Sequence, residues 1–482
     1  MIRPEVIEKL DCPSVGLATS WTIVQRGFRN VPLNNLEAAR TFFDRKYWPF
    51  PKRKIAQSNS KAAGLREQGN AAYKKDPNDP GKALELYNQS ICMAQDGSKD
   101  LGLGYANRSA VYFNCKQYRE CLQNIALARC HNYPAEMMPK LLQREARCKQ
   151  LLMMEVDDGE SETAGTTGHC AIKSCLELCQ DGKGICTNRS LDVGEKVLVE
   201  KPFVLVLEAE FAYERCDYCG ESNAHNLLPC RDCTAVMYCS EECREQSLQR
   251  YHQFECEIVD DLQLLFRGPK ATRMFHVILR LFWHAVLLFL EDTEGFLRRI
   301  ETPAELEKYR DPFTLEPSDY VLHLNATCVE TYADAAPETG KCVAQIMAIL
   351  MYVIAVEENT SLWPRLEGKQ GKTKLLDLLY RLIQHMGRLV NEDVEHVTCF
   401  FPFASLLQCS DSPNAEQLLQ NLQSVVVLKC PIAEGEKITI VKKIHNTVNL
   451  TGYQIIQHNT VDVDEIGNGL GDRSFPNTAR IP

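Results

Sequence analysis

The strongest constraint on this chain is the spacing of seven cysteines and His252 between Cys216 and Cys256. Cysteines separated by two or three residues can converge on one ion from a tight turn or the first turn of a helix, and zinc binds four such ligands tetrahedrally. Eight ligands therefore predict two closed zinc sites, which are structural because no coordination position is left for water. Chance placement of buried cysteines would not give this spacing. The ligands stand in four pairs: Cys216 and Cys219, Cys230 and Cys233, Cys239 and Cys243, and His252 and Cys256.

Composition favours metal ligands and buried thiols over disulfides. The chain has 482 residues, of which 45% are hydrophobic, and it holds 22 cysteines. This is enough apolar material for two to four globular domains. The first residues do not form a basic segment followed by an apolar segment, the pattern of a secretory signal. We therefore expect no secretory signal and a reducing compartment. We predict the cytoplasm, with the nucleus as an alternative if Pro51–Lys54 (PKRK) is a nuclear address and not a solvated basic face.

Charge and hydropathy argue against two classes of partner. Because the chain has a formal net charge of -10, we predict that it does not bind nucleic acid directly. The longest apolar run, Met274–Leu290, is too short to span a membrane and contains Arg280, His276 and His284. We therefore predict a buried amphipathic helix, no membrane contact, and core or interface positions for the two histidines.

The order of the cysteine pairs, the YCSEEC step and the terminal His-x3-Cys resemble the MYND zinc finger, a protein-interaction module. In that family the first and third pairs share one zinc, and the second and fourth pairs share the other. Crossed ligands have a physical use, because some forty residues cannot build a stable hydrophobic core and metal binding then supplies the folding free energy. The resemblance implies one site of Cys216, Cys219, Cys239 and Cys243, and a second of Cys230, Cys233, His252 and Cys256.

Two upstream segments, Leu65–Ile91 and Tyr105–Ala128, resemble each other at the scale of a helical hairpin. Small residues such as Gly69 and Ala83 recur where paired helices must approach closely, with aromatic residues between them. The segments resemble tetratricopeptide repeats, with a third partial unit at Lys140–Leu152.

A polar pattern within the repeats resembles the clamp by which tetratricopeptide co-chaperones hold the acidic C-terminal tail of cytosolic heat-shock chaperones. Residues four apart share a helix face, so cations and amides from successive helices could line one groove for carboxylates. The alternative is that these are common repeat residues and solvated charges. The partner-binding candidates are Arg66, Asn70, Asn107, Lys140 and Arg144.

Next to the finger, Asp181–Leu207 (DGKGICTNRSLDVGEKVLVEKPFVLVL) resembles the start of a SET methyltransferase domain of the SET and MYND family. In that family the finger is inserted into the SET fold. The resemblance implies that the turn of Gly182, Lys183 and Gly184 lies along S-adenosylmethionine. The segments Phe401–Asn414 and Leu428–Ile440 resemble the closing SET core, and with repeats in front the chain most resembles the tetratricopeptide-bearing member of the family.

We therefore predict a multidomain α+β chain: a helical repeat array, then a split β-rich SET domain with an inserted two-zinc finger and a helical insert. In chain order the predicted parts are an N-terminal segment of unknown role (1–59), tetratricopeptide repeats (60–152), a linker or helix (153–180), the first part of the SET domain (181–210), the MYND finger (216–256), the helical SET insert (261–395), a degenerate SET core (396–445) and a tail (446–482).

The resemblance fails at the residues that an active SET site needs. Gln408–Asp411 (QCSD) stands where the family has an Asn-His-Ser-Cys loop, and Val441–Lys443 follows the last strand where the family has a tyrosine. No cysteine follows Cys430, so the family's post-SET zinc site has no ligands, and we assign no catalytic residue. Tyr453–Gly467 resembles a family segment that normally precedes the loop. Decay and truncation both remain open.

Two functions remain as hypotheses. The first is a protein-lysine methyltransferase that uses S-adenosylmethionine, with weak or no activity in this chain. The second is a non-enzymatic adaptor, in which the repeats dock a chaperone tail and the finger recruits another protein. A further metal site at Cys170, Cys175, Cys179 and Cys186 is less favoured than buried thiols on a helix face.

Overall fold

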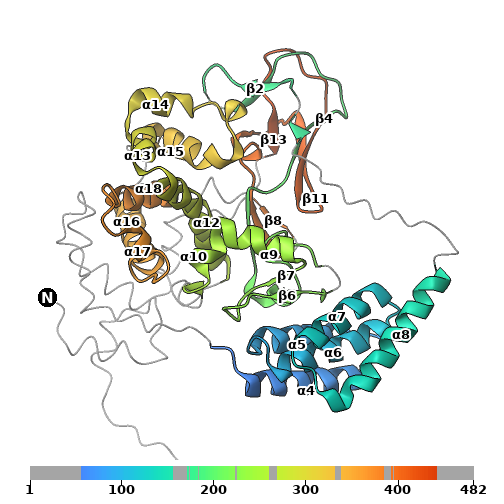
Figure 1. Ribbon diagram of the computed structural model, residues 1–482. Coiled ribbons are helices and arrows are strands. Elements are labelled where there is room, and N and C mark those ends of the chain that lie inside the picture. The colour runs from blue at the N-terminus through green and yellow to red at the C-terminus, as the bar shows by residue number, and fades with distance from the viewer. Residues whose placement is uncertain are drawn as a thin grey trace, which may run out of the picture.

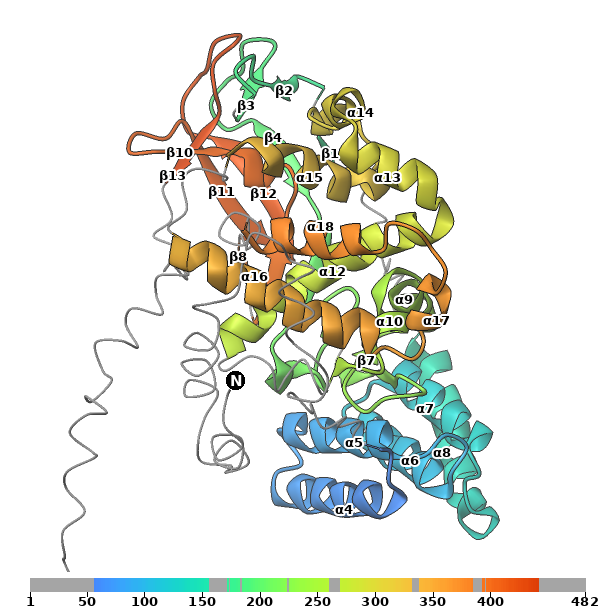
Figure 2. The ribbon, with the colours of Figure 1, turned by 90° about the vertical axis from the view of Figure 1, so that its left-hand side faces the viewer.

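The protein is described here by a computed structural model, which covers residues 56–155, 171–172, 174–182, 184–222, 225–259, 269–331, 338–384, 392–394 and 396–441. It is a mixed α+β chain with an N-terminal helical array, several small sheets and a mainly helical segment that follows the finger in sequence (Figures 1 and 2). The predictions made for the basic stretch 51–54, for Cys170 and Lys183, and for the tail 446–482 lie outside the described residues, as does nearly all of segment 1–59.

The N-terminal array consists of helical hairpins, as the repeat pattern predicts. Each helix packs against the next one along the chain: α4 with α5, α5 with α6, α6 with α7, and α7 with α8. Two of the helices begin with a serine N-cap, because Ser58 and Ser98 accept the backbone N–H of Lys61 and Leu101. The helices are α4 (Asn59–Lys75), α5 (Gly81–Met93), α6 (Lys99–Asn114), α7 (Tyr118–Cys130) and α8 (Met138–Glu155).

The small residues of the repeats allow the close helix contacts that the sequence suggests. A Cβ placed on Gly69 of α4 would lie 2.7 Å from Cε1 of Tyr87 on α5. Such a distance is a steric clash, so the Tyr87 ring fills the space that Gly69 leaves open. Ala83 and Cys121 are likewise buried in the same core.

The β-rich part is assembled from strands on both sides of the finger. The larger sheet has the order β1-β4-β12-β11, and the second has the order β5-β9-β8. Val204 pairs with Phe400 and Val199 with Val425, so residues before the finger pair with residues after the helical segment. The strands are β1 (Ala171–Ile172), β4 (Lys196–Glu200), β5 (Val204–Leu207), β8 (Glu392–Val394), β9 (Val397–Phe400), β11 (Ala415–Gln420) and β12 (Gln423–Leu428).

Four shorter strands complete the sheets. Strand β2 (Leu176–Leu178) pairs antiparallel with β3 (Ile185–Thr187), and β10 (Gln408–Ser410) pairs parallel with β13 (Thr439–Val441). In the finger, β6 (Leu228–Pro229) pairs antiparallel with β7 (Met237–Tyr238).

The expectation that Cys175 and Cys179 share a helix face is wrong. Strand β2 lies between them, and its turn to β3 uses two left-handed glycines, Gly182 with φ +67° and Gly184 with φ +90°. A spacing of four residues fits a helical turn, but these backbone conformations favour glycine and a hairpin instead.

The apolar run predicted as a buried helix is α12 (Pro269–Glu291). The expectation that this run is too short to span a membrane is wrong, because its stretch Arg273–Glu291 is long and apolar enough by length and composition. However, 67% of that stretch is buried within the protein. Trp283 and Phe289 are fully buried in the largest core, which supports the prediction of a core helix. The helices around it are α13 (Thr293–Glu301), α14 (Pro303–Lys308), α15 (Tyr320–Thr331), α16 (Glu338–Tyr352), α17 (Trp363–Leu366) and α18 (Thr373–Gln384).

Two glycines of α4 provide a matched test of the repeat packing. We expect Gly69→Ala to destabilise the repeats by about 1–3 kcal/mol, because its Cβ meets the Tyr87 ring. Gly64→Ala meets no atom within 4 Å and should stabilise the same helix by up to about 1 kcal/mol. Hydrogen exchange of α4 and α5 in the full chain measures both. Equal effects of the two substitutions would contradict the close contact.

Candidate metal centre and neighbouring sites

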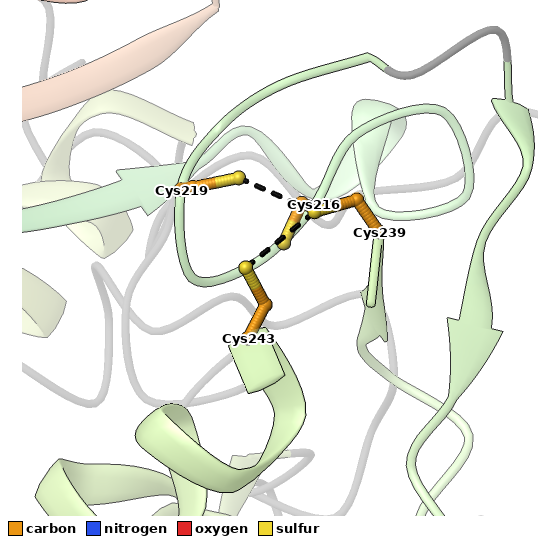
Figure 3. A group of neighbouring side chains, drawn as sticks. All are labelled: Cys216, Cys219, Cys239 and Cys243. Atoms are coloured by element: carbon orange, nitrogen blue, oxygen red, sulfur yellow. Dashed lines mark hydrogen bonds between the residues drawn. The ribbon is translucent and has the colours of Figure 1, made fainter. Parts of the chain in front are cut away.

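The structure brings the eight ligands together in two groups, each with ligand atoms that lie within 4.8 Å of one another. In the first group, Cys216, Cys219, Cys239 and Cys243 direct their sulfur atoms toward a common point (Figure 3). The Sγ of Cys239 lies 3.6 Å from that of Cys219 and 3.5 Å from that of Cys243. These are the four residues that the crossed MYND pattern assigns to one ion.

The second group consists of Cys230, Cys233, His252 and Cys256. Its histidine is fully buried and turns Nε2 toward the sulfurs, at 3.2 Å from Sγ of Cys230 and 3.6 Å from Sγ of Cys233. The sulfurs of Cys230 and Cys256 are 3.8 Å apart. Both groups therefore have the crossed arrangement that the resemblance implies.

Local backbone geometry explains how each pair converges. Gly220, with φ +77°, closes the turn of the first pair by donating its N–H to the carbonyl of Cys216 at 2.8 Å. Ser240 caps α9 (Glu241–Ser247) through the N–H of Cys243, so that Cys243 lies in the first helical turn. A π-helical turn, Leu248–His252, then leads into α10 (Gln253–Glu255) before Cys256.

The chemistry of the donors fits a bound cation. Each group places four donor atoms within 4.8 Å of one another, and close thiolates repel one another unless a cation lies between them. Zinc removes this conflict because it binds thiolates and neutral imidazole together. The two donor sets are consistent with two structural zinc ions.

A buried arginine on α12 joins the finger to the helical segment. Arg280 is fully buried and donates Nη2 to Oδ1 and Oδ2 of Asp217 at 2.9 and 2.8 Å, and to Oε2 of Glu255 at 3.2 Å. Asp217 lies between two ligands of the first group, and Glu255 lies next to a ligand of the second. Sequence reasoning placed Arg280 in a buried helix but did not predict its partners, although a charge inside an apolar helix signals a paired carboxylate.

The two histidines of α12 lie at interfaces, as predicted. His276 directs Nε2 toward Oε2 of Glu255 at 3.2 Å. His284 packs against Phe203 with ring centroids 4.6 Å apart, and burial lowers the pKa of His284 to about 4.

The glycine turn that the resemblance assigns to the cofactor lies against Gln408. Gly184 is buried, and a Cβ placed on it would lie 3.0 Å from Cγ of Gln408. Gly182 is exposed, and Lys183 lies outside the described residues. The side chain of Gln408 therefore covers the inner glycine of the turn.

A buried carboxyl group sets the turn that precedes Gln408. Glu200 of β4 accepts the backbone N–H of Phe403 and of Ala404, both at 2.9 Å. Burial raises the pKa of Glu200 to about 7, although these two hydrogen bonds act in the opposite direction. Sequence reasoning missed Glu200, for which an acid directly after the apolar run Val197–Val199 was the available signal.

The five partner-binding candidates lie on α4, α6 and α8, but they do not form one open cradle. Oδ1 of Asn70 accepts hydrogen bonds from Nδ2 of Asn107 and from the Tyr87 hydroxyl, both at 2.8 Å. Arg66 lies 3.5 Å from a carboxylate oxygen of Asp100. The polar groups nearest the centre of the pattern are thus engaged within the array.

Lys140 and Arg144 instead line a groove of about 740 Å³ between α6 and α8. Arg144 is anchored there, because its Nη1 donates to the Ala106 carbonyl at 3.0 Å and to Oγ of Ser109 at 2.7 Å. The lining contains cationic and apolar side chains and no acidic one: Ala110, Phe113, Asn114, Lys140, Gln143, Arg144, Ala146, Arg147 and Gln150.

Cys175, Cys179 and Cys186 are buried thiols and do not form a third ligand group within the described part of the chain. The Cys179 N–H donates to the carbonyl of Gly184 at the end of the β2–β3 hairpin. These cysteines therefore belong to the core beneath the glycine turn.

Comparison with known proteins agrees with the geometry. The family model of the MYND finger matches residues 216–256. Protein-lysine N-methyltransferase SMYD4 of Danio rerio is 27% identical over 234 residues, which is 43% of this chain and 31% of that protein. SMYD4 of Homo sapiens is 26% identical over 268 residues, which is 40% of this chain and 33% of that protein. The matches thus span about a third of the length of these curated relatives.

A shorter match points in the same direction. Protein-lysine N-trimethyltransferase SMYD5 of Gallus gallus is 35% identical over 105 residues, which is 16% of this chain and 25% of that protein.

Zinc content tests the two ligand groups. We expect the purified chain to hold two zinc ions and Cys219→Ser or Cys233→Ser to hold about one, because three ligands retain zinc far less well than four. Cys115→Ser, a cysteine of the repeats outside both groups, is the control and should keep both ions. Atomic emission spectroscopy of the dialysed proteins gives the count. An unchanged count in both ligand variants would overturn the assignment.

Proposed function

Because the chain is related to the SET and MYND family, we propose that its β-rich part is a SET domain of the protein-lysine methyltransferase class, with weak or no methyl transfer. The supporting observation is the pairing of β4 with β12 and of β5 with β9, across the finger and the helical segment. In the paired sheets, Gly184 of the glycine turn lies next to Gln408. Gln408 is the first of the four residues that stand in place of the Asn-His-Ser-Cys loop. In such a site S-adenosylmethionine supplies the methyl group.

Part of the closing core is retained. Asn414 fits the family pattern after the loop, and it donates Nδ2 to the Lys437 carbonyl at 2.8 Å and accepts the N–H of Thr439 at 2.8 Å. These bonds hold the loop end against β13. These contacts support the proposed position of a cofactor turn.

The groups that would position the reactants are replaced. Gln408 packs on Gly184, and Val441, the last residue of β13, stands where the family tyrosine would orient a lysine amine. A methyltransferase works largely by positioning its two reactants, so these replacements affect the main source of rate enhancement. We accordingly propose poor cofactor binding and slow transfer.

Cofactor binding is the direct test. Calorimetry of the zinc-loaded chain should give a dissociation constant for S-adenosylmethionine weaker than about 1 mM, or no heat. The triple variant Gln408→Asn, Cys409→His and Asp411→Cys restores the family loop and should tighten binding by at least about tenfold. Micromolar binding by the unaltered chain would contradict the proposed weakness. Unchanged binding after restoration would contradict the location of the cofactor turn.

The groove between α6 and α8 favours a second candidate function, that of an adaptor. Lys140 is exposed at this groove and Phe113 offers an apolar surface beside it. A peptide with a terminal carboxylate and an apolar side chain matches this combination of charge and surface. We propose the acidic tail of a cytosolic chaperone as the partner, which would place the encounter in the cytoplasm.

A peptide ending in EEVD provides the test of the adaptor. We expect Lys140→Ala to weaken its binding by about tenfold, since a charge-assisted hydrogen bond is lost. Lys149→Ala is the control, because Lys149 lies on the same helix and pairs with Glu145 outside the groove. Fluorescence anisotropy with the full chain measures both. Equal binding by both variants would remove Lys140 from the proposed site.

A further inference from the structure

The repeat array contacts the finger through a second buried arginine. Arg108 of α6 is fully buried, and its Nη1 donates to the backbone carbonyl of Leu227 in the finger at 2.8 Å. The same guanidinium donates Nε to Oδ1 of Asn124 at 2.7 Å and Nη1 to Oδ1 of Asn88 at 2.5 Å. One cation therefore organises two asparagines of the repeats and one carbonyl of the finger.

The two asparagines turn their amide groups toward the finger and the segment before it. Nδ2 of Asn88 donates to the carbonyls of Tyr213 and His225, both at 2.8 Å. Nδ2 of Asn124 donates to Oδ1 of Asn226 at 2.8 Å. These amide groups are buried. If the finger loop changes shape, they lose their hydrogen-bond acceptors, and water cannot reach them to replace those acceptors.

Apolar contacts complete this interface. Leu227 and Met237 of the finger are fully buried within the hydrophobic core of the repeats. The Cys92 thiol of α5 points at the Val236 carbonyl, with 3.7 Å between sulfur and oxygen. The finger surface of residues 225–237 therefore contributes Leu227 and Met237 to the core of the repeats.

The surface 225–237 is also the part of the finger that the second ligand group shapes. It contains Cys230 and Cys233. The other two ligands of this group, His252 and Cys256, lie in the helical end of the finger, so the group joins the surface to that end. The Cys230 N–H donates to the Val236 carbonyl at 3.2 Å. A ligand of the second group is therefore hydrogen-bonded directly to Val236, the finger residue that Cys92 of the repeats faces.

We infer that zinc at the second group organises the docking surface for the repeat array, so that this face of the finger binds the repeats of its own chain. Zinc loading and repeat docking are then linked equilibria, and each strengthens the other by the same factor. The surface 225–237 is occupied by the repeats, so a separate partner protein must use another face of the finger. This inference rests on zinc binding and is independent of methyl transfer.

Zinc release from the full chain tests the linkage. We expect Asn88→Ala to release one of its two zinc ions to a chelator about tenfold faster than the unaltered chain, because two buried hydrogen bonds to the docked segment are lost. Asn226→Ala removes a contact from the finger side and should accelerate release of the same ion. Arg129→Ala is the control, because Arg129 is an exposed residue of α7 that pairs with Glu145 and should leave both rates unchanged.

Hydrogen exchange supplies the reciprocal measurement. Removing both zinc ions from the unaltered chain should raise amide exchange in α5 and α7, while circular dichroism still reports helix. Zinc release at the unaltered rate in both asparagine variants would overturn the inference. Exchange of α5 and α7 that is the same with and without zinc would overturn it as well.

Discussion

Two buried arginines hold the zinc finger at the centre of this chain. Arg280 reaches it from the helical segment through the carboxylates of Asp217 and Glu255, and Arg108 reaches it from the repeats through the carbonyl of Leu227. A buried guanidinium is costly unless its donors find partners, so the positions of the helices on either side depend on the shape of the finger. The finger in turn has too few residues for a core of its own and depends on its metal ligands.

Polar contacts from the sheets hold the segment that contains Gln408. Glu200 fixes the turn at Phe403, and Asn414 ties the residues after this segment to β13. Between them, Gln408 covers Gly184. The residues that support the sheets therefore differ from those that the proposed function assigns to the reactants, so the fold does not depend on the chemistry.

Sequence alone predicted the features that local spacing encodes. Four Cys/His pairs predicted two metal sites, and small residues at helix contacts predicted the hairpins. Spacing could not identify the partners of Arg108 or Arg280, because those partners lie far away in sequence and only the fold brings them near. It also misled at Cys175, since two thiols four residues apart fit either a helical turn or the two ends of a short strand.

The split sheet has a consequence for synthesis on the ribosome. Strand Val204–Leu207 is made about 190 residues before its partner Val397–Phe400, and at roughly 5–20 residues per second the interval is on the order of ten to forty seconds. The apolar run VLVL therefore leaves the ribosome as an unpaired edge, the type of surface that aggregates. The repeats are made before this strand and the finger is made within that interval, so a chain that loads its metal early can assemble both before the sheet closes.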